Sequence, residues 1–301
     1  MKKGLDIKRI LITGANKGIG LATAKKLLES YRNTYVLLGS RDLSKGKQAL
    51  ESLLKGDPEF KDRVYLVQIN VEQDDSVNSA VEEVAETFGK TPGTLYGIVN
   101  NARIGNSVDG LEKILQVNTF GPKRVCDVFI PLLDESYGRI VNVTSASGPV
   151  FLSGSSDETK KLLTNPGITW TAIQDYMDEC VDANSKNKIS SDHDSSSGSA
   201  YGLSKACTNA YTIFLAGQYP DLTVNACTPG FIETDLTRPM ALAGGKTPAE
   251  MGMKSPEEGA STSVFLLMGN PQSSGHYYGS DCLRSPIDRY RSPGDPPYTG
   301  D

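Results

Sequence analysis

The sequence predicts a single α/β domain in which a mainly parallel, doubly wound sheet carries helices on both faces. Short aliphatic or β-branched runs alternate along the chain with longer stretches whose apolar residues recur at helical spacing. Repeated strand–helix–strand units form right-handed crossovers, which produce a parallel sheet covered on both sides. The chain has 301 residues, enough for one large domain or two. One domain over residues 1–282 explains the alternation better than two.

Six runs have the composition of strands. They cover residues 9–13, 35–40, 64–70, 95–100, 139–144 and 222–227. Between them lie amphipathic stretches, such as LATAKKLLES at 21–30 and SVNSAVEEVAETFG at 76–89, whose apolar side chains fall on one helical face. Strands and helices therefore alternate as this fold class requires.

One connection is much longer than those typical of compact domains. Residues 149–198 separate the fifth predicted strand from a predicted helix. The run TWTAIQDYMDECV within them has a capping-box pattern at Thr171 and Gln174, followed by apolar residues at helical spacing. We therefore predict a helical insertion at 149–198 that ends in a polar run.

The end of the chain has a composition that disfavours regular structure. Residues 283–301 read LRSPIDRYRSPGDPPYTGD and are rich in proline, glycine and charge. We predict a flexible, solvated tail there. Its two Arg-Ser-Pro tripeptides, at 284–286 and 291–293, would also suit phosphorylation or docking.

Composition predicts a protein of the cytoplasm. A net charge of −5 and the lack of a basic run argue against nucleic acid or an anionic membrane as partner. No apolar stretch approaches the roughly 18 residues of a membrane span, and the first residues lack the apolar core of a signal peptide. The five scattered cysteines predict free thiols in a reducing compartment. His193 and His276 are the only histidines, so we expect no metal site.

A glycine-rich turn follows the first predicted strand and opens a helix. In TGANKGIG, residues 13–20, the glycines Gly14, Gly18 and Gly20 allow a tight turn and a close approach of the backbone to a pyrophosphate. The charge of the pyrophosphate would be met by amide groups and by the dipole of the helix N-terminus. The turn predicts a dinucleotide-binding Rossmann domain.

A basic residue stands at the end of the second predicted strand, where dinucleotide folds often have an acid. An Asp or Glu about 20 residues after the glycine turn commonly binds the ribose 2′-hydroxyl. Here Arg41, together with Lys17 of the glycine turn, would bind a 2′-phosphate. This favours NADPH or NADP⁺ over the cofactors without that phosphate. In the alternative interpretation, Arg41 is a solvated charge and Asp42 binds the ribose.

A tyrosine and a lysine share one face of the helix predicted after the insertion. Tyr201 and Lys205 are four residues apart, and a nearby ammonium stabilises a phenolate and lowers its pKa. Tyr201 could then deliver a proton to a carbonyl oxygen while hydride reaches the carbon. Ser145, at the end of the fifth predicted strand, could donate a hydrogen bond to the same oxygen, although Ser147 and Thr144 are alternatives.

Several motifs occur in the order that is typical of one enzyme family. They are TGANKGIG (13–20), NNAR (100–103), QVNTFG with Asn118, Ser145, YGLSK (201–205) and PGFIETD (229–235). Together they resemble the short-chain dehydrogenase/reductase family over about residues 9 to 240. The long insertion and the runs NKGIGLA, SRD, NACTPG and KSPEEGA make the chain similar to the monomeric carbonyl reductases of that family.

The resemblance implies a role for each matching residue. Tyr201 would be the proton donor, Lys205 would lower its pKa and bind the nicotinamide ribose, Ser145 would orient the carbonyl, and Asn118 would hold a water that links Lys205 to solvent. The implied cofactor-binding residues are Gly14, Asn16, Lys17, Gly18, Ile19, Gly20, Arg41, Asn70, Val71, Asn100, Ala102, Tyr201, Lys205, Pro229, Gly230, Ile232 and Thr234.

Two of these regions depart from the family pattern. Asn70 replaces the usual aspartate near adenine, and it can still hydrogen-bond the base without a charge. Arg103 replaces the glycine of the usual NNAG motif, at a point where the backbone passes close to the cofactor. An arginine there would either clash or turn outward to hold a phosphate or an acidic substrate.

We therefore predict a monomeric, NADPH-dependent carbonyl reductase that reduces a small ketone, aldehyde or quinone to an alcohol or hydroquinone. The resemblance implies that the insertion covers the surface through which most of the family dimerises. Two alternatives are a non-catalytic NADP(H)-binding redox sensor and an alcohol or steroid dehydrogenase that works in the oxidative direction. Candidates for an apolar substrate wall, or else for the core of the insertion, are Pro149, Val150, Phe151, Trp170, Phe231 and Met240.

Overall fold

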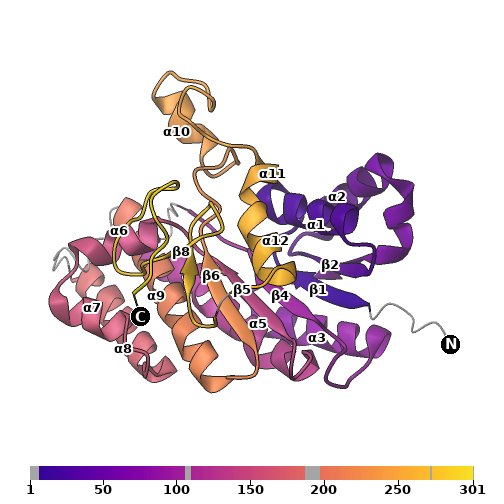
Figure 1. Ribbon diagram of the computed structural model, residues 1–301, viewed down its shortest axis with the longest axis horizontal. Helices are drawn as coiled ribbons and strands as arrows, with labels where there is room; N and C mark the ends of the chain where they lie inside the picture. Colours follow the sequence, from indigo (N-terminus) through magenta and orange to yellow (C-terminus); the bar gives the residue numbers. More distant parts are fainter. Residues whose placement is uncertain (1–6, 106–109, 187–196, 272, 301) are drawn as a thin grey trace.

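An eight-stranded sheet forms the centre of the molecule (Figure 1). The computed structural model describes residues 7–105, 110–186, 197–271 and 273–300, with the backbone alone at 197, 198 and 240. The strand order is β3-β2-β1-β4-β5-β6-β7-β8, and neighbouring strands are parallel except β7 and β8. The strands are β1 (Lys8–Ile12), β2 (Thr34–Ser40), β3 (Val64–Gln68), β4 (Gly97–Asn100), β5 (Arg139–Val143), β6 (Thr223–Cys227), β7 (Tyr277–Tyr278) and β8 (Arg284–Ser285). The predicted α/β class with a mainly parallel sheet is confirmed.

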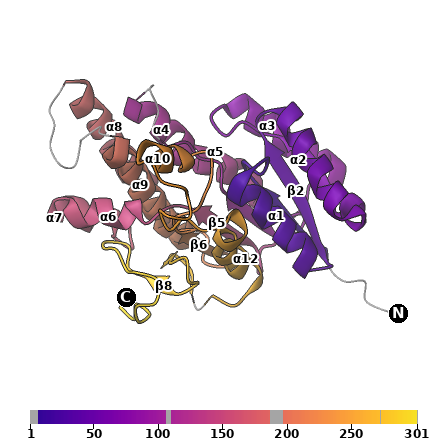
Figure 2. The ribbon, with the colours of Figure 1, turned by 90° about the horizontal axis from the view of Figure 1, so that it is seen from above.

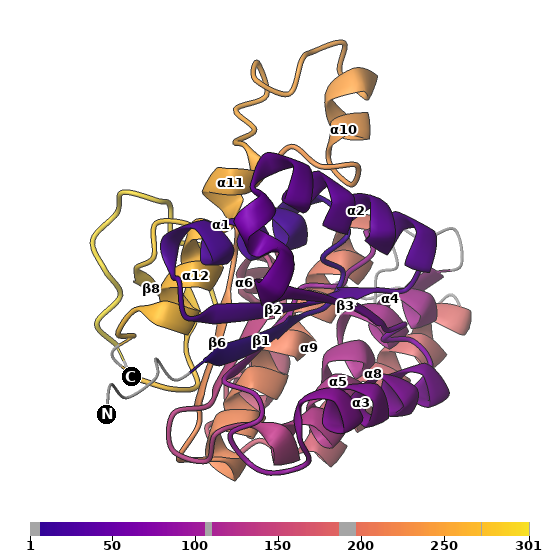
Figure 3. The ribbon, with the colours of Figure 1, turned by 90° about the vertical axis from the view of Figure 1, so that its right-hand side faces the viewer.

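Helices cover both faces of the sheet (Figure 3). On one face lie α1 (Gly18–Ser30), α2 (Leu43–Gly56) and α12 (Ser261–Met268). On the other lie α3 (Asp74–Phe88), α4 (Gly110–Asn118), α5 (Phe120–Phe129) and α9 (Ser197–Gln218). Successive residues of a strand point to opposite faces of the sheet. Ile10 and Ile12 of β1 therefore pack in the core beneath α1, α2 and α12, and Leu11 packs in the core on the opposite face.

The long insertion is helical, as predicted. It forms α6 (Ser147–Gly154), α7 (Asp157–Leu163) and α8 (Trp170–Ser185), and all three pack against α9. The predicted start of α8 is wrong by two residues, because Thr169 rather than Thr171 caps the helix. The Thr169 side chain accepts a hydrogen bond from the amide of Ala172, and Gln174 accepts one from the Trp170 indole instead of reaching back to the cap. The polar run after α8 lies largely outside the described residues.

The region after residue 283 contains regular structure that its composition does not predict. Arg284–Ser285 form β8, which pairs antiparallel with β7 at the edge of the sheet. The expectation of a structureless tail is therefore wrong for these two residues. The segment that follows lies beside α6 (Figure 2), and Arg291 within it makes five hydrogen bonds to four other residues. The boundary at residue 283 stays a prediction.

The connection between β6 and α12 projects from the body of the molecule. It carries α10 (Arg238–Ala243) and α11 (Pro256–Gly259). Figures 1 and 3 show α10 standing away from the sheet, whereas α11 returns to pack against α1. This connection starts at the end of β6, beside the other residues that are candidates for the site.

Candidate active site

The candidate residues gather where the parallel strands end. In doubly wound sheets this edge binds ligands, above all where the strand order reverses, which here is between β1 and β4. Two cavities open there, of about 510 Å³ and about 340 Å³. The larger cavity is lined by ten of the predicted cofactor residues: Gly14, Asn16, Lys17, Gly18, Ile19, Arg41, Asn70, Val71, Ala102 and Thr234. The smaller is lined by Ser145, Ser147 and Gly230 among others.

The glycine turn has the backbone conformation that its glycines permit. Gly14 and Gly18 have φ angles of 62° and 55°, in the left-handed region that side chains disfavour. A Cβ atom on Gly14 would lie 2.9 Å from the Cα atom of Ala102. A Cβ atom on Gly20 would lie 2.5 Å from the side-chain nitrogen of Asn101. The turn therefore brings the N-terminus of α1 to the floor of the larger cavity.

Asn101 holds this turn in place, and the sequence-based predictions do not include it. Its side chain donates hydrogen bonds to the carbonyl oxygens of Thr13 and Gly14, at 2.9 and 3.1 Å. The side chain is almost fully buried. Asn100, which is predicted to bind cofactor, instead donates to Asn142 beneath the cavity at 2.8 Å. The adjacent asparagines of NNAR could have indicated that one of them contacts the glycine turn. The sequence does not show which one does so.

Arg41 and Asp42 lie at the far end of the larger cavity. The Asp42 carboxylate accepts a hydrogen bond from the amide of Lys45 and so caps α2, with the Lys45 ammonium 3.9 Å away. Arg41 makes no ion pair with any residue that the structure describes, and its side chain is exposed at the cavity. Among the described residues Arg41 thus has no carboxylate partner, while the neighbouring acid is already engaged.

Lys17 is placed at the cavity but already has a partner. Its ammonium lies 2.6 Å from a carboxylate oxygen of Asp235, which belongs to the connection after β6. Arg238 pairs with the same carboxylate and with Glu233. These exposed pairs link the glycine turn to the projecting connection across the mouth of the cavity. A phosphate would have to compete with Asp235 for Lys17.

Tyr201, Lys205 and Ser145 form one constellation. Tyr201 and Lys205 lie one turn apart on α9, with the lysine ammonium 5.5 Å from the centre of the tyrosine ring. Lys205 is 1% exposed, and its ammonium donates to the carbonyl oxygen of Val143 at the end of β5. Ser145, two residues further along, hydrogen-bonds to Tyr201. The sequence-predicted catalytic residues are therefore brought together.

Burial sets the acid–base properties of this constellation. It raises the pKa of the Tyr201 phenol, whereas the positive charge of Arg103 and the hydrogen bond from Ser145 lower it. Burial also lowers the pKa of the Lys205 ammonium well below its usual value, and Arg103 adds to that effect. The phenol is consequently protonated near neutral pH and able to act as a proton donor.

Arg103 lies within electrostatic range of the candidate catalytic residues Tyr201 and Lys205. It lines the larger cavity beside Ala102, is half-buried, and acts on the pKa values of both Tyr201 and Lys205. Among the residues with described positions, none forms an ion pair with Arg103. The arginine that replaces a family glycine therefore places a positive charge in the larger cavity.

Asn118 connects the loop around Ile104 to helix α9. Its amide exchanges two hydrogen bonds of 3.0 Å with the backbone of Ile104 and donates a third to the Ser204 hydroxyl. The Asn118 carbonyl accepts from Thr208, one turn beyond Ser204. These contacts fix the loop that carries Arg103 relative to α9. A link from Asn118 to Lys205 through water stays a prediction.

The alternatives to Ser145 have different environments. Thr144 is buried and donates to the carbonyl oxygen of Cys227, which leaves it a structural role. Ser147 begins α6, lines the smaller cavity and lies 3.2 Å from Ser145, oxygen to oxygen. Ser145 is the serine in contact with Tyr201.

The predicted apolar substrate wall is only partly brought together. Pro149 and Phe231 line the smaller cavity, whereas Phe151 and Trp170 pack against the core of the insertion. Val150 is exposed outside the cavity lining, and the side chain of Met240 lies outside what the structure describes. Pro229 and Ile232 are buried and line neither cavity.

Comparison with known proteins identifies the family. Residues 8–156 match the family model described as short chain dehydrogenase. The (+)-neomenthol dehydrogenase of Arabidopsis thaliana is 32% identical over 286 residues, covering 86% of this chain and 90% of that protein. The chain belongs to the short-chain dehydrogenase/reductase family. It is accordingly an oxidoreductase.

Two further relatives span nearly the whole chain. Human carbonyl reductase (NADPH) 1 is 29% identical, over 91% of this chain and 95% of that protein. The structure of salutaridine reductase from Papaver somniferum matches with a TM-score of 0.76 and 29% identity, over 90% of this chain and 99% of that one. In the described ranges no helix has the length and apolar character needed to cross a membrane.

Proposed function

We propose that this short-chain dehydrogenase/reductase uses NADPH to reduce a ketone, aldehyde or quinone carbonyl. The observation that carries the proposal is the constellation of Tyr201, Lys205 and Ser145. The half-buried tyrosine contacts the Ser145 hydroxyl and lies one helical turn from the buried lysine. Tyr201 donates the proton to the carbonyl oxygen, and Ser145 holds that oxygen by a hydrogen bond.

The larger cavity fits a dinucleotide. A Cβ atom at Gly14 or Gly20 would collide with the chain around Ala102 and Asn101, so the backbone is kept bare where a pyrophosphate would lie. Bound there, the reduced nicotinamide supplies the hydride. The side-chain nitrogen of Asn70 is available to the adenine, because within the described part of the chain only the side-chain oxygen is engaged, by the backbone amide of Glu72.

A preference for NADPH over NADH follows from the charges at the far end of that cavity. Arg41 is free for a 2′-phosphate, whereas the Asp42 carboxylate is used as the cap of α2. This supports the role of Arg41 over the alternative in which Asp42 binds the ribose. The names of the carbonyl reductase relatives specify NADPH as well.

The test is turnover by the purified protein. Oxidation of NADPH, followed by the loss of its absorbance, would be measured with a panel of quinones, aromatic aldehydes and α-dicarbonyls, with NADH in parallel. Reduction with NADPH and little with NADH is expected. NADPH binding without turnover of any carbonyl, in either direction, would overturn the enzyme proposal.

Arg103 favours a second candidate, a non-catalytic NADP(H)-binding sensor. Its unpaired charge acts on both Tyr201 and Lys205, in the region where a nicotinamide would have to lie. The complete catalytic constellation favours the enzyme. Oxidation of an alcohol or steroid with NADP⁺ is the reverse of the same reaction, and the relative rates in the two directions would decide its direction.

We also propose a cytoplasmic monomer. The insertion packs α8 against α9 through the buried side chains Ile173, Met177 and Cys180, which covers a helix that the family resemblance places at dimer interfaces. Light scattering coupled to size-exclusion chromatography would test the monomer, and a dimer mass would refute it. Localisation of a tagged full-length chain would test the compartment.

A further inference from the structure

The smaller cavity is closed on one side by the C-terminal part of the chain. Ser145 and the start of α6 form one wall, and the connection after β6 forms a second. The opposite wall comes from residues 279–293, which we call the C-terminal wall. Its members that line the cavity are Gly279, Ser280, Ser285, Tyr290, Arg291 and Pro293.

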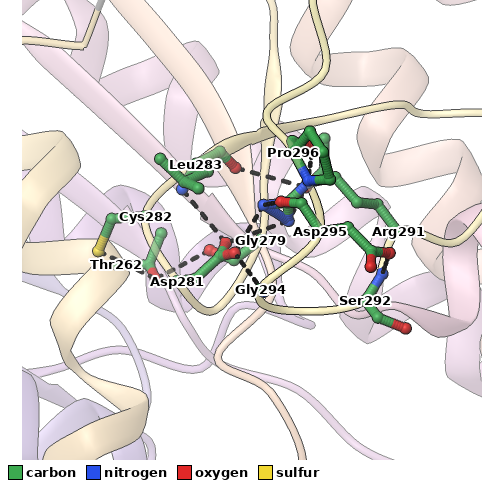
Figure 4. Close-up of polar contacts among 11 residues, drawn as sticks. Thr262, Gly279, Asp281, Cys282, Leu283, Arg291, Ser292, Gly294, Asp295 and Pro296 are labelled. Atoms are coloured by element: carbon green, nitrogen blue, oxygen red, sulfur yellow. Dashed lines mark hydrogen bonds and ion pairs between the residues drawn. The ribbon is translucent and has the colours of Figure 1, made fainter.

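A buried ion pair holds the C-terminal wall together (Figure 4). The two terminal nitrogens of Arg291 donate to the two carboxylate oxygens of Asp281, at 2.6 and 3.3 Å. Only 5% of the Arg291 side chain is exposed. The guanidinium also donates to the carbonyl oxygens of Asp295 and Pro296, at 3.1 and 3.0 Å. Because a planar guanidinium fixes several acceptors at once, this pair sets where the wall lies.

The turn at the start of the wall leaves little room for movement. The amide of Gly279 donates to the carbonyl oxygen of Leu283, and the amide of Cys282 donates to that of Gly279. Cys282 has a φ angle of 62°, and a Cβ atom on Gly279 would lie 2.6 Å from the carboxylate of Asp281. The turn thus presents Asp281 to Arg291 in one arrangement.

The wall offers free hydroxyl groups to the cavity. Throughout the described structure, neither the Ser280 nor the Tyr290 hydroxyl has a hydrogen-bond partner, although both residues line the cavity that also contains Ser145. Tyr277 lines the same cavity, and its hydroxyl is hydrogen-bonded to Thr228. A cavity of about 340 Å³ with polar groups opposite the catalytic serine suits a small carbonyl compound with a polar far end.

We propose that Tyr290 and Ser280 bind an oxygen substituent of the substrate and that Arg291 is the residue that positions them. The preferred substrates are carbonyl compounds with a hydroxyl group away from the reacting carbonyl, rather than hydrocarbon ketones. A site built to hydrogen-bond a hydroxyl discriminates against the analogue without it. This inference rests on the proposed carbonyl reduction, but its test also measures the binding of the aldehydes.

The first experiment compares benzaldehyde with meta- and para-hydroxybenzaldehyde as substrates. The wild type should have a KM about five- to tenfold lower for at least one hydroxylated aldehyde, which corresponds to one hydrogen bond. Tyr290→Phe, or Ser280→Ala if the serine is the main partner, should abolish this preference, so that the KM values for the hydroxylated and the unsubstituted aldehyde converge.

The positioning role of Arg291 has a matched control. Arg291→Met should remove the preference for the hydroxylated aldehyde, and Arg291→Lys should restore part of it, because lysine still pairs with Asp281. Arg289→Met is the control, since Arg289 is exposed and pairs with Asp288 outside the cavity lining. NADPH affinity and melting temperature are measured on each variant. They distinguish a variant in which only the C-terminal wall is displaced from one that is unfolded.

The outcomes distinguish this inference from the proposed function. If Tyr290→Phe, Ser280→Ala and Arg291→Met all keep the wild-type preference, or if the wild type has none, the wall does not recognise the substrate and the inference is wrong. If the wild type reduces no aldehyde, calorimetric binding of the same three aldehydes to Tyr201→Phe with NADP⁺ replaces the kinetics. A binding preference that disappears with Tyr290→Phe and Ser280→Ala together would then support the wall, and its persistence would refute it.

Discussion

Lys205 holds its ammonium 5.5 Å from the centre of the Tyr201 ring, one turn away on the same helix. Because Lys205 is buried and donates to the end of β5, its position is set by the sheet rather than by solvent. The lysine thus approaches the tyrosine from the interior of the domain. Removing the Tyr201 hydroxyl should separate chemistry from binding.

Tyr201→Phe should lower kcat by about 10²- to 10⁴-fold, the usual contribution of a general acid. The ring remains, so the Kd for NADPH should change less than about twofold, well under the contribution of a typical hydrogen bond. Stopped-flow turnover and fluorescence titration measure the two quantities. Tyr219→Phe, at a partly exposed residue just beyond α9, is the matched control. Turnover of Tyr201→Phe at the wild-type rate would disprove the mechanism.

Ser145→Ala should move the pH dependence as well as the rate. The hydrogen bond from Ser145 lowers the pKa of Tyr201, so its loss raises that pKa further. Reduction needs the protonated phenol, and its alkaline limb should shift to higher pH, while kcat falls by about 10- to 100-fold. Ser147→Ala is the control. An alkaline limb that shifts only in Ser147→Ala would assign the substrate hydrogen bond to Ser147 instead.

Arg41→Ala should weaken NADPH binding by about 10-fold or more, since a hydrogen bond to a charged group contributes about 1.5–3 kcal/mol. NADH lacks the 2′-phosphate, so its binding should be nearly unchanged. Calorimetric titration of both cofactors at two salt concentrations measures the difference. Lys47→Ala, an exposed cation of α2 outside the cavity, should have no effect. If the substitution weakened the binding of NADPH and of NADH equally, Arg41 would have a structural role instead.

Gly20→Ala and Gly217→Ala should change stability in opposite directions. A methyl on Gly20 would lie 2.5 Å from Asn101 and 2.7 Å from the carbonyl oxygen of Gly14, so the turn must shift, at a cost of about 1–3 kcal/mol. A methyl on Gly217, in α9, meets nothing within 4 Å and should stabilise by about 0.5–1 kcal/mol. Urea unfolding of both variants tests the pair. A neutral Gly20→Ala would mean that the turn is loosely packed.

The sequence predicts the strands of the sheet well where they are buried on both faces. Six strands match within two residues, since parallel strands covered on both faces are nearly continuous apolar runs. The short strands β7 and β8 have two residues each, too few for any periodic signal. The turn between these two strands carries Asp281, whose ion pair with Arg291 links residues that no spacing rule connects.

The site is predictable in so far as its residues belong to local motifs. Tyr201 and Lys205 share one helix, and the glycine turn is continuous, so both are visible in the sequence. Asn101, Ser280 and Tyr290 come from loops whose placement is decided by tertiary contacts. The ion pair of Lys17 with Asp235, 218 residues away in sequence, is of the same kind. Long-range polar contacts of this type leave no local pattern.

Arg103→Gly restores the family residue and tests what the arginine does in the cleft. Its positive charge lowers the pKa of both Tyr201 and Lys205, so its removal should raise both values. The phenol then stays protonated to higher pH, and the alkaline limb of reduction should move upward in Arg103→Gly while Arg103→Lys keeps it in place. Rates across the pH range, with NADPH affinity measured in parallel, provide the comparison. If the wild type is inactive and Arg103→Gly gains turnover, the arginine blocks the nicotinamide site and the sensor is the correct interpretation. If the wild type is active and Arg103→Gly leaves the pH profile unchanged, the guanidinium lies away from the phenol when cofactor is bound.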